Sequence, residues 1–218
     1  MGALKPGLYA ITDEQLTPAA ELLPAVEAAL RGGAVLVQYR NKTGSQAERL
    51  RQATDLASLC RQANVPLLIN DDPPLAKRVQ ADGVHLGQED CTLTEARALL
   101  GSEAIIGMTC HHRLDLARTA RDNGADYLAF GRFYTSSTKP GAPPADASVL
   151  TEAKTLGLPL TAIGGITVDN GRPLIEAGAD LLAVVGGLFG GTPEQIEHRA
   201  RAFARLFASH HPLFSLSD

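Results

Sequence analysis

Carboxylates collect at the ends of two short apolar segments in the middle of the chain. Residues 66–71 (PLLIND) end in Asp71, which Asp72 follows, and residues 83–87 (GVHLG) lead directly to Glu89 and Asp90. Apolar runs of this length bounded by turn residues are typical of buried strands, and a helical crossover between them makes them parallel neighbours. Both strands then deliver carboxylates to the same edge of a sheet. A hard cation such as Mg²⁺ would relieve their repulsion, so we predict a metal site here.

A second polar cluster follows the apolar segment at residues 34–40 (AVLVQYR). Because side chains alternate between the two faces of a strand, Gln38, Arg40 and Lys42 share one face. An amide and two cations on one face can hold an anion, with the guanidinium gripping phosphate oxygens bidentately and the ammonium acting as a point charge. The alternative is a solvated strand end, where charged side chains are common. A diphosphate needs both cations and a metal, which favours an anion site.

Later segments add groups that suit a phosphate. Thr109 ends the apolar segment at 105–109, and four further hydroxyl and amine donors follow the segment at 127–131, namely Ser136, Ser137, Thr138 and Lys139. Double glycines at 164–165 and 186–187 end the last two apolar segments. Glycine lets a phosphate approach backbone N–H groups closely. We therefore predict a monophosphate site beside the diphosphate site.

The elements that must position these residues alternate regularly. Strand-like segments begin at residues 7, 34, 66, 83, 105, 127, 160 and 181, and a helix-length segment follows each one. Eight such units predict a single (β/α)8 TIM barrel that makes residues 1–218 one domain, with the barrel at about 7–209 and a short tail at 210–218. We expect the first helix to begin near Thr17 and Pro18, where threonine can cap and proline can fill the first turn. Chemistry in this fold lies at the carboxyl ends of the strands, where the polar clusters stand.

A weak internal repeat precedes four of the predicted strands. It reads GGA at residues 32–34, ADG at 81–83, and GAD at 124–126 and 178–180. Glycine can supply the left-handed conformation that ends a helix. We therefore predict helix-ending turns with a structural role at the bottom of the barrel.

Composition limits the kinds of partner and location. A net charge of −4 and an isoelectric point near 5.9 argue against a nucleic-acid or anionic-membrane surface. No apolar run reaches the length of about 18 residues that a membrane helix needs. The three cysteines, Cys60, Cys91 and Cys110, are odd in number and widely spaced, which favours a reducing compartment. We expect a cytoplasmic protein.

In these residues the chain resembles the thiamine-phosphate synthase (thiamine-phosphate pyrophosphorylase) family. The shared motifs run in order as GLYAIT, Q-x-R-x-K, INDD, ADGVHLGQED, STKPGAP, AIGGI and VVGGLF. The resemblance implies that Asp71 and Asp90 bind Mg²⁺ and that Arg40, Lys42 and Lys139 stabilise a departing diphosphate. It implies pyrimidine diphosphate contacts at Gln38, Tyr39, Arg40, Asn41, Lys42, Asn70, Thr109 and Lys139, and thiazole phosphate contacts at Ser136, Ser137, Thr138, Gly165, Val185 and Gly186.

The activity that this resemblance implies joins two small molecules. The thiazole nitrogen of 4-methyl-5-(2-phosphooxyethyl)thiazole would attack the methylene of 4-amino-2-methyl-5-hydroxymethylpyrimidine diphosphate as diphosphate departs, through a pyrimidine cation. The partners would be these substrates, with no nucleic acid and no membrane. Whether the chain forms a homo-oligomer stays an open question. Two alternatives are a thiazole tautomerase that shifts a proton, through His111, and a non-catalytic barrel that binds a phosphate metabolite. The tautomerase needs neither the cation cluster nor Mg²⁺, so those residues favour the synthase.

Three positions depart from the family pattern. Thr109 stands where serine is usual and keeps the hydroxyl group. The loop reads TSSTK at residues 135–139 in place of T-x-T-K, so the identity of the first binding hydroxyl stays open. Gly186 stands where serine is usual and leaves only a backbone donor, which would weaken binding of the thiazole phosphate.

Overall fold

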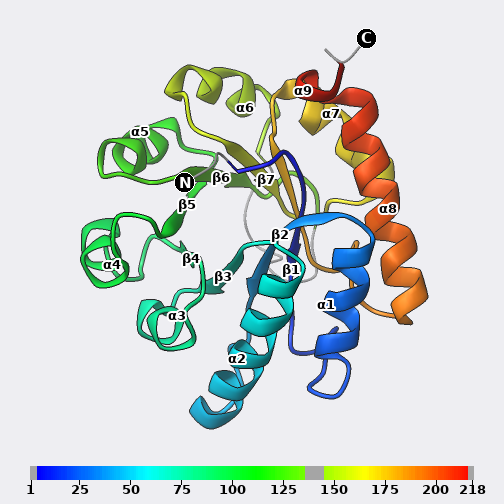
Figure 1. Cartoon of the computed structure of the whole chain (residues 1–218). Helices are drawn as coiled ribbons and strands as arrows, with labels where there is room; N and C mark the ends of the chain where they lie inside the picture. Colours follow the sequence, from blue (N-terminus) through cyan, green and yellow to red (C-terminus); the bar gives the residue numbers. More distant parts are fainter. Residues whose placement is uncertain (1–3, 136–144, 216–218) are drawn as a thin grey trace.

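Eight parallel strands close into a barrel (Figure 1). The computed structural model describes residues 4–135 and 145–215. Each strand pairs with the next, and β1 closes the ring by pairing with β8. The strands are β1 (Gly7–Ile11), β2 (Ala34–Tyr39), β3 (Leu67–Asn70), β4 (Gly83–Leu86), β5 (Ile105–His111), β6 (Tyr127–Gly131), β7 (Leu160–Ile163) and β8 (Leu181–Val184). The predicted (β/α)8 TIM barrel is confirmed.

Helices form a ring around the strands in chain order (Figure 1). They are α1 (Leu22–Arg31), α2 (Gln46–Gln62), α3 (Pro73–Val79), α4 (Leu93–Leu100), α5 (Leu114–Asp122), α6 (Ser148–Ala153) with the 3₁₀ turn η1 (Lys154–Leu156), α7 (Val168–Ala177), α8 (Pro193–His210) and the short α9 (Pro212–Ser215). Ser45, Thr92 and Thr192 accept the capping hydrogen bonds of α2, α4 and α8, as their residue types favour. None of the helices described is both long and apolar enough to cross a membrane.

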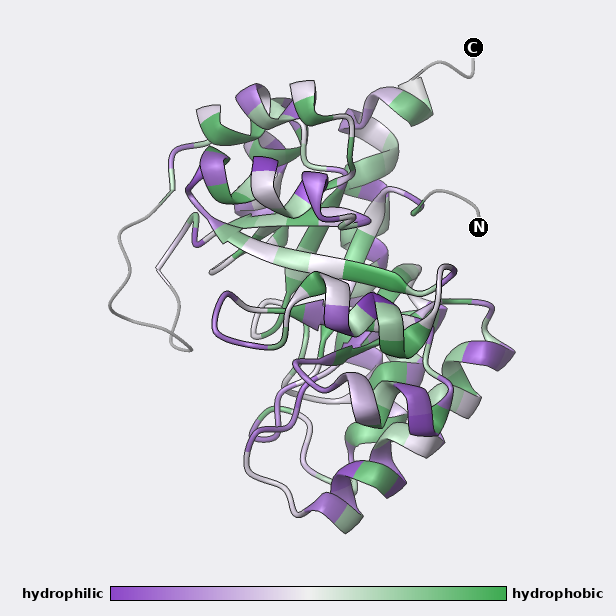
Figure 2. Ribbon diagram, turned by 90° about the vertical axis from the view of Figure 1, so that its left-hand side faces the viewer, coloured by the Kyte–Doolittle hydropathy of each residue, from purple (hydrophilic) through white to green (hydrophobic). Residues whose placement is uncertain are grey.

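The core has two layers, because each strand buries both faces. Residues such as Leu8, Ala10 and Val37 pack between the strands and the helices. Their neighbours Tyr9 and Leu36 point into the barrel interior. The strands are accordingly hydrophobic along most of their length, whereas the helices alternate between hydrophobic and hydrophilic residues (Figure 2).

The same alternation decides which polar side chains of β2 reach the mouth of the barrel. Gln38 follows the inward-facing Leu36 by two residues, and Arg40 follows Gln38 by two more; both line the central cavity. Tyr39 lies between them and points the other way, where its hydroxyl donates to Gln52 Oε1 on α2 at 2.6 Å. The predicted shared face is therefore confirmed for Gln38 and Arg40, whereas Lys42, the third residue of that prediction, lies beyond the end of β2 and does not line the cavity.

The repeat before the even-numbered strands has a structural role at the bottom of the barrel. Asp82, Asp126 and Asp180 each accept a hydrogen bond from a backbone N–H near the start of the preceding strand, at Leu67, Ile106 and Leu160, over 2.7 to 2.8 Å. Each aspartate thereby joins two neighbouring strands. The glycines Gly33, Gly124 and Gly178 have φ between +86° and +119°, as the prediction of left-handed helix ends requires.

Replacing Asp126 with alanine should weaken this joint. The change leaves the Ile106 N–H without its acceptor and removes the Arg97 contact at 2.7 Å, so the free energy of unfolding should fall by about 1–3 kcal/mol. Urea denaturation measures the difference. Asp122→Ala is the matched control, because that carboxylate pairs with its neighbour Arg121 on the surface and its loss should change stability by less than about 0.5 kcal/mol. Equal losses in the two variants would contradict a joining role.

Two local predictions are wrong. The first helix begins at Leu22, one turn later than expected, because the Thr17 hydroxyl donates to the Asp13 carbonyl instead of capping a helix. Gly83 does not end a helix; Gln80 takes the left-handed conformation there, with φ +55°. Gly83 is needed for space instead, since a Cβ atom would overlap the backbone of Ile105 on the adjoining strand.

Candidate functional site

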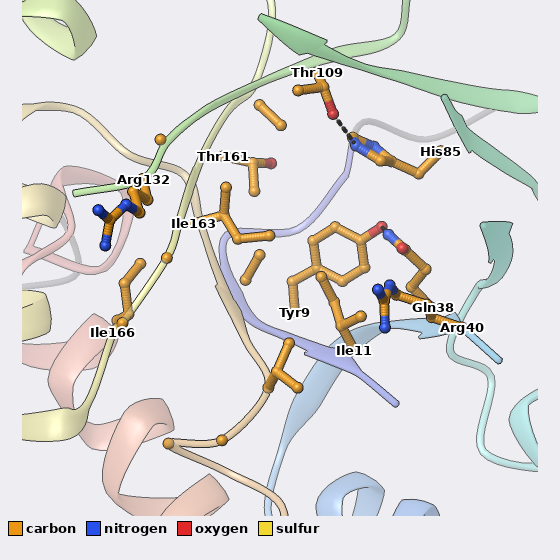
Figure 3. A pocket seen from close by; sticks show the side chains of 18 of the residues that line it. Tyr9, Ile11, Gln38, Arg40, His85, Thr109, Arg132, Thr161, Ile163 and Ile166 are labelled. Carbon is orange, nitrogen blue, oxygen red and sulfur yellow. Dashed lines mark hydrogen bonds between the residues drawn. The ribbon is translucent and has the colours of Figure 1, made fainter. Parts of the chain in front are cut away.

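A cavity of about 550 Å³ opens at the carboxyl ends of the strands, where the fold predicts chemistry (Figure 3). Strand β2 supplies Gln38 and Arg40 to its wall, and β3 supplies Asn70. The opposite wall comes from the ends of β6, β7 and β8, four strands away around the ring. The cavity therefore has two walls that face each other.

Asp71 and Asp90 meet beside the first wall. Asn70, which lines the cavity, donates to Asp71 Oδ2 at 2.6 Å, and Lys42 Nζ lies 3.4 Å from the same oxygen. Burial and the nearby Asp71 carboxylate raise the pKa of Asp90, against a hydrogen bond from Gly87 N–H that lowers it. The structure thus brings together two carboxylates that come from different strands, as the sequence predicted.

This pair suits a hard divalent cation that keeps most of its other positions for water and substrate. Mg²⁺ is usually held by one or two carboxylates together with phosphate oxygens. Within residues 4–135 and 145–215, no group of three or more histidine, cysteine, aspartate or glutamate side chains could hold a metal. An arrangement of two hard oxygen ligands without sulfur or nitrogen fits Mg²⁺ better than Zn²⁺.

Arg40 is held in place at the cavity wall from both its backbone and its side chain. Its N–H donates to Thr12 Oγ1 at 2.9 Å, and its guanidinium lies 3.3 Å from Asp13 Oδ2 and 3.8 Å from Glu14 Oε2. The late start of α1 leaves residues 13–21 free to form the turns that carry these two acids. An arginine held in this way presents its remaining N–H groups to an anion in the cavity.

Three predicted binding residues of β2 and its loop, Tyr39, Asn41 and Lys42, do not line the cavity. Tyr39 is buried against α2, and Asn41 accepts from the N–H groups of Thr43 and Gly44 while donating to Gln52. Their side chains shape the strand end and the loop. Lys42 lies within the turn that Asn41 closes with Thr43 and Gly44, and this turn places Lys42 beside Asp71.

The second wall combines glycines with a cation. Gly165, Val185 and Gly186 line it, as predicted, and Gly165 has φ +65°. Arg132 also lines it, packed with its Cβ against Gly164, and lies across the cavity from Arg40 (Figure 3). Arg132 was not among the predicted site residues, although its position directly after β6 was a usable signal. Ser136, Ser137, Thr138 and Lys139 lie outside the described residues.

The floor of the cavity is polar, which the sequence analysis also missed. Tyr9, His85 and Thr161 line it, and Thr109 lies above His85 with its hydroxyl 2.9 Å from His85 Nε2 (Figure 3). Thr161 Oγ1 is buried and has no hydrogen-bond partner among the described residues. The signal was a polar residue at an inward-facing position of an otherwise apolar strand, as in GLYAI and GVHL.

Of the two strand-five histidines, only His111 reaches the cavity. It ends β5 with φ +52°, and it is exposed. His112 is exposed and does not line the cavity.

Comparison with known proteins finds relatives of this chain. A family described as thiamine monophosphate synthase matches residues 8–188. A thiamine-phosphate synthase from Marinobacter nauticus is 70% identical over 215 residues, which is 99% of this chain and 97% of the relative.

Solved structures show the same likeness. A thiamine phosphate pyrophosphorylase from Pyrococcus furiosus superimposes with a TM-score of 0.85 at 30% identity, covering 94% of this chain and 97% of that one. A thiamine phosphate pyrophosphorylase from Bacteroides thetaiotaomicron shares the fold, with a TM-score of 0.70 at 17% identity over 94% of this chain and 99% of that one. The family match and the close relative both span the strands that build the cavity. This chain belongs to the thiamine monophosphate synthase family.

Proposed function

We propose that this chain is a Mg²⁺-dependent thiamine-phosphate synthase. It would join 4-amino-2-methyl-5-hydroxymethylpyrimidine diphosphate to 4-methyl-5-(2-phosphooxyethyl)thiazole and release diphosphate. The observation that carries the proposal is the pairing of two anion-binding walls across one cavity. Gln38, Arg40 and Asn70 on one wall face Gly165, Gly186 and Arg132 on the other. Asp71 lies beside the first wall, in contact with Asn70 and Lys42. The 70% identical synthase from Marinobacter nauticus supports the same activity.

The first wall suits the diphosphate. Asp71 and Asp90 would hold Mg²⁺, which when bound neutralises charge that develops on the leaving diphosphate. Arg40 and Lys42 add positive charge on the same side, and Asn70 and Thr109 add neutral donors. Lys139 is a further cation in this proposal.

The second wall suits the thiazole phosphate. Backbone N–H groups at Gly165 and Gly186 can approach phosphate oxygens closely, and Arg132 supplies a guanidinium beside them. Ser136, Ser137 and Thr138 complete this site in the proposal. Val185 lines the same wall and would give the thiazole ring an apolar surface.

The reaction needs positioning and charge stabilisation more than proton transfer. The C–O bond between the pyrimidine methylene and the diphosphate breaks, and both bonding electrons leave with the diphosphate. The ring nitrogen of the thiazole then donates its lone pair to the methylene carbon and forms the new C–N bond. Arg40 and Lys42 stabilise the departing charge, and the facing walls hold nitrogen and carbon in line.

Diphosphate release on mixing both substrates with Mg²⁺ tests the proposal. A coupled phosphatase assay should detect diphosphate only when both substrates are present, in equal amount to the thiamine phosphate formed. A tautomerase would convert a thiazole phosphate isomer without releasing diphosphate, and a binding protein would release none. Either result would replace the proposed activity.

The glycine at position 186 allows a gain-of-binding prediction. A Cβ atom there would meet only Leu16 Cδ1, at 3.8 Å, and the backbone is not left-handed, so Gly186→Ser should fit without strain. Its hydroxyl adds one phosphate donor, and the KM for the thiazole phosphate should fall about three- to tenfold. Gly186→Ala is the control that adds volume without a donor. If serine and alanine change KM equally, Gly186 does not contact the phosphate.

A further inference from the structure

Five polar side chains form a continuous hydrogen-bonded chain beneath the cavity. Gln38 Nε2 donates to Tyr9 Oη, which lies 2.8 Å from Tyr127 Oη. Tyr127 Oη lies 2.7 Å from His85 Nδ1, and His85 Nε2 lies 2.9 Å from Thr109 Oγ1. We call these five residues the relay. It crosses the barrel interior from β2 to β5 by way of β1, β6 and β4, so residues far apart in the sequence become coupled.

Tyr127 holds the middle of the relay without lining the cavity. It is fully buried, its ring meets Tyr9 edge-on at 6.0 Å, and it stacks on His85 at 5.6 Å. Gly107 on β5 makes room for it, because a Cβ atom there would overlap the Tyr127 ring and hydroxyl. Packing therefore fixes where the phenol oxygen lies.

The hydrogen-bond directions along the relay follow from its first donor. Tyr9 accepts from the Gln38 amide group, and the order that leaves no buried phenol hydrogen without an acceptor sends the Tyr9 hydrogen to Tyr127 and the Tyr127 hydrogen to His85 Nδ1. His85 then carries its hydrogen on Nε2 and donates to Thr109. Burial raises the pKa of both phenols far above the usual range, so each keeps its hydrogen.

The two ends of this ordered relay present different groups to the cavity. Because its amide nitrogen donates to Tyr9, Gln38 keeps its carbonyl oxygen as an acceptor for a ligand. Because Thr109 accepts from His85, its own hydroxyl hydrogen is left to donate to a ligand. One end therefore accepts from an amino group, and the other donates to an anion.

We propose that Tyr127 and His85 are positioning residues that lock the Gln38 amide as an acceptor and thereby make the cavity specific for an aminopyrimidine over its oxo analogue. The inference rests on the proposed function, since it concerns the pyrimidine substrate. An amino group donates to the Gln38 carbonyl oxygen. A ring carbonyl at the same place would face another acceptor, which leaves both oxygens without a hydrogen.

Removing one hydroxyl from the middle of the relay tests this idea. In Tyr127→Phe the Tyr9 hydrogen loses its acceptor and turns to Gln38, whose amide rotates to accept it. Gln38 then presents its NH₂ group to the cavity. The ratio of kcat/KM for the amino substrate to kcat/KM for the 4-oxo analogue should fall at least about tenfold, because one hydrogen bond is lost to the first and one gained by the second. The KM for the thiazole phosphate should stay unchanged.

A control variant that destabilises the fold by a similar amount separates a positioning role from a general loss of stability. Gln52→Met also removes a buried hydrogen-bond partner, that of the Tyr39 hydroxyl, but it lies on α2 away from the cavity. It should lower the melting temperature and leave the amino-to-oxo ratio as in the wild type. A ratio that falls equally in Gln52→Met and Tyr127→Phe would overturn the proposal.

A second variant tests the same proposal if Tyr127→Phe does not fold. Tyr9→Phe removes the hydroxyl that orients Gln38, so both amide orientations become accessible and the ratio should again fall. An unchanged ratio in the folded variant overturns the proposal. Wild-type protein that releases no diphosphate from either pyrimidine would instead refute the proposed function, and direct binding of the two pyrimidines by calorimetry would still measure the preference.

Discussion

Replacing Asp71 or Asp90 with asparagine should slow diphosphate release by about 10²- to 10³-fold, the range seen when one group that stabilises a developing anion is lost. Asparagine keeps the size of each side chain. It retains an oxygen for the Gly87 N–H bond of Asp90, and it tolerates the left-handed backbone of Asp71, where φ is +57°. The expected loss is therefore one of charge at the metal site. Initial rates over a range of Mg²⁺ concentrations, with a chelator as the zero point, measure it.

Asp72 offers the matched control for both variants. It follows Asp71 directly, but its carboxylate caps α3 by accepting from Leu75 N–H at 2.9 Å and pairs with Arg49. Asp72→Asn keeps the cap, because asparagine caps helices about as well as aspartate, and it should leave the rate and the Mg²⁺ dependence near the wild type. Near-normal turnover of Asp71→Asn or Asp90→Asn in chelator would refute the metal assignment.

The pKa of Asp90 adds a pH dependence to the same experiment. Burial and the Asp71 carboxylate raise that pKa, so a proton competes with the metal for the pair more strongly than at an isolated aspartate. The Mg²⁺ concentration needed for half-maximal rate should therefore rise as pH falls towards the acid range. The Asp90→Asn variant should lose this part of the pH dependence.

Gly165→Ala should lower kcat/KM for the thiazole phosphate by about 10²-fold, mainly through a higher KM, because a displacement of about 1 Å of a bound reactant can cost that much. The residue has φ +65°, and an added Cβ would lie 2.9 Å from the Tyr134 carbonyl carbon and closer still to the Thr135 carbonyl oxygen. Both are backbone atoms at the start of the loop after β6, so the chain itself must shift. Steady-state kinetics with each substrate varied in turn measure the effect, and the KM for the pyrimidine diphosphate should change much less.

Gly157→Ala separates the local backbone cost from the loss of the binding site. Gly157 has φ +72°, close to that of Gly165, but an added Cβ would meet nothing within 4 Å. Both substitutions should lower stability by about 1–2 kcal/mol for the left-handed backbone. Only Gly165→Ala should change KM, and a similar change in Gly157→Ala would mean that general destabilisation explains both.

Parts of the site could be predicted because their positions depend on patterns within short segments of the sequence. The alternation of side chains in β2 placed Gln38 and Arg40 on one face, and the parallel order of β3 and β4 placed Asp71 and Asp90 at one end. Period and strand direction are properties of short segments. The start of α1 could not be predicted in the same way. Before Leu22 the chain forms turns in place of the expected helical start. These turns contain Asp13 and Glu14, which contact Arg40, about 27 residues away in the chain.

The eight-stranded barrel, the end of the barrel that carries the site, and the family could all be predicted from the amino-acid sequence. These follow from alternating apolar segments and from motifs in a fixed order. Three features became visible in the folded chain alone: Arg132 faces Arg40 across the cavity, Tyr39 turns away from it, and five residues from five strands join in the relay. The physical reason is closure of the barrel. Closure brings inward-facing side chains of β1, β4 and β6 within hydrogen-bonding distance, although Tyr9 and Tyr127 are 118 residues apart in the chain.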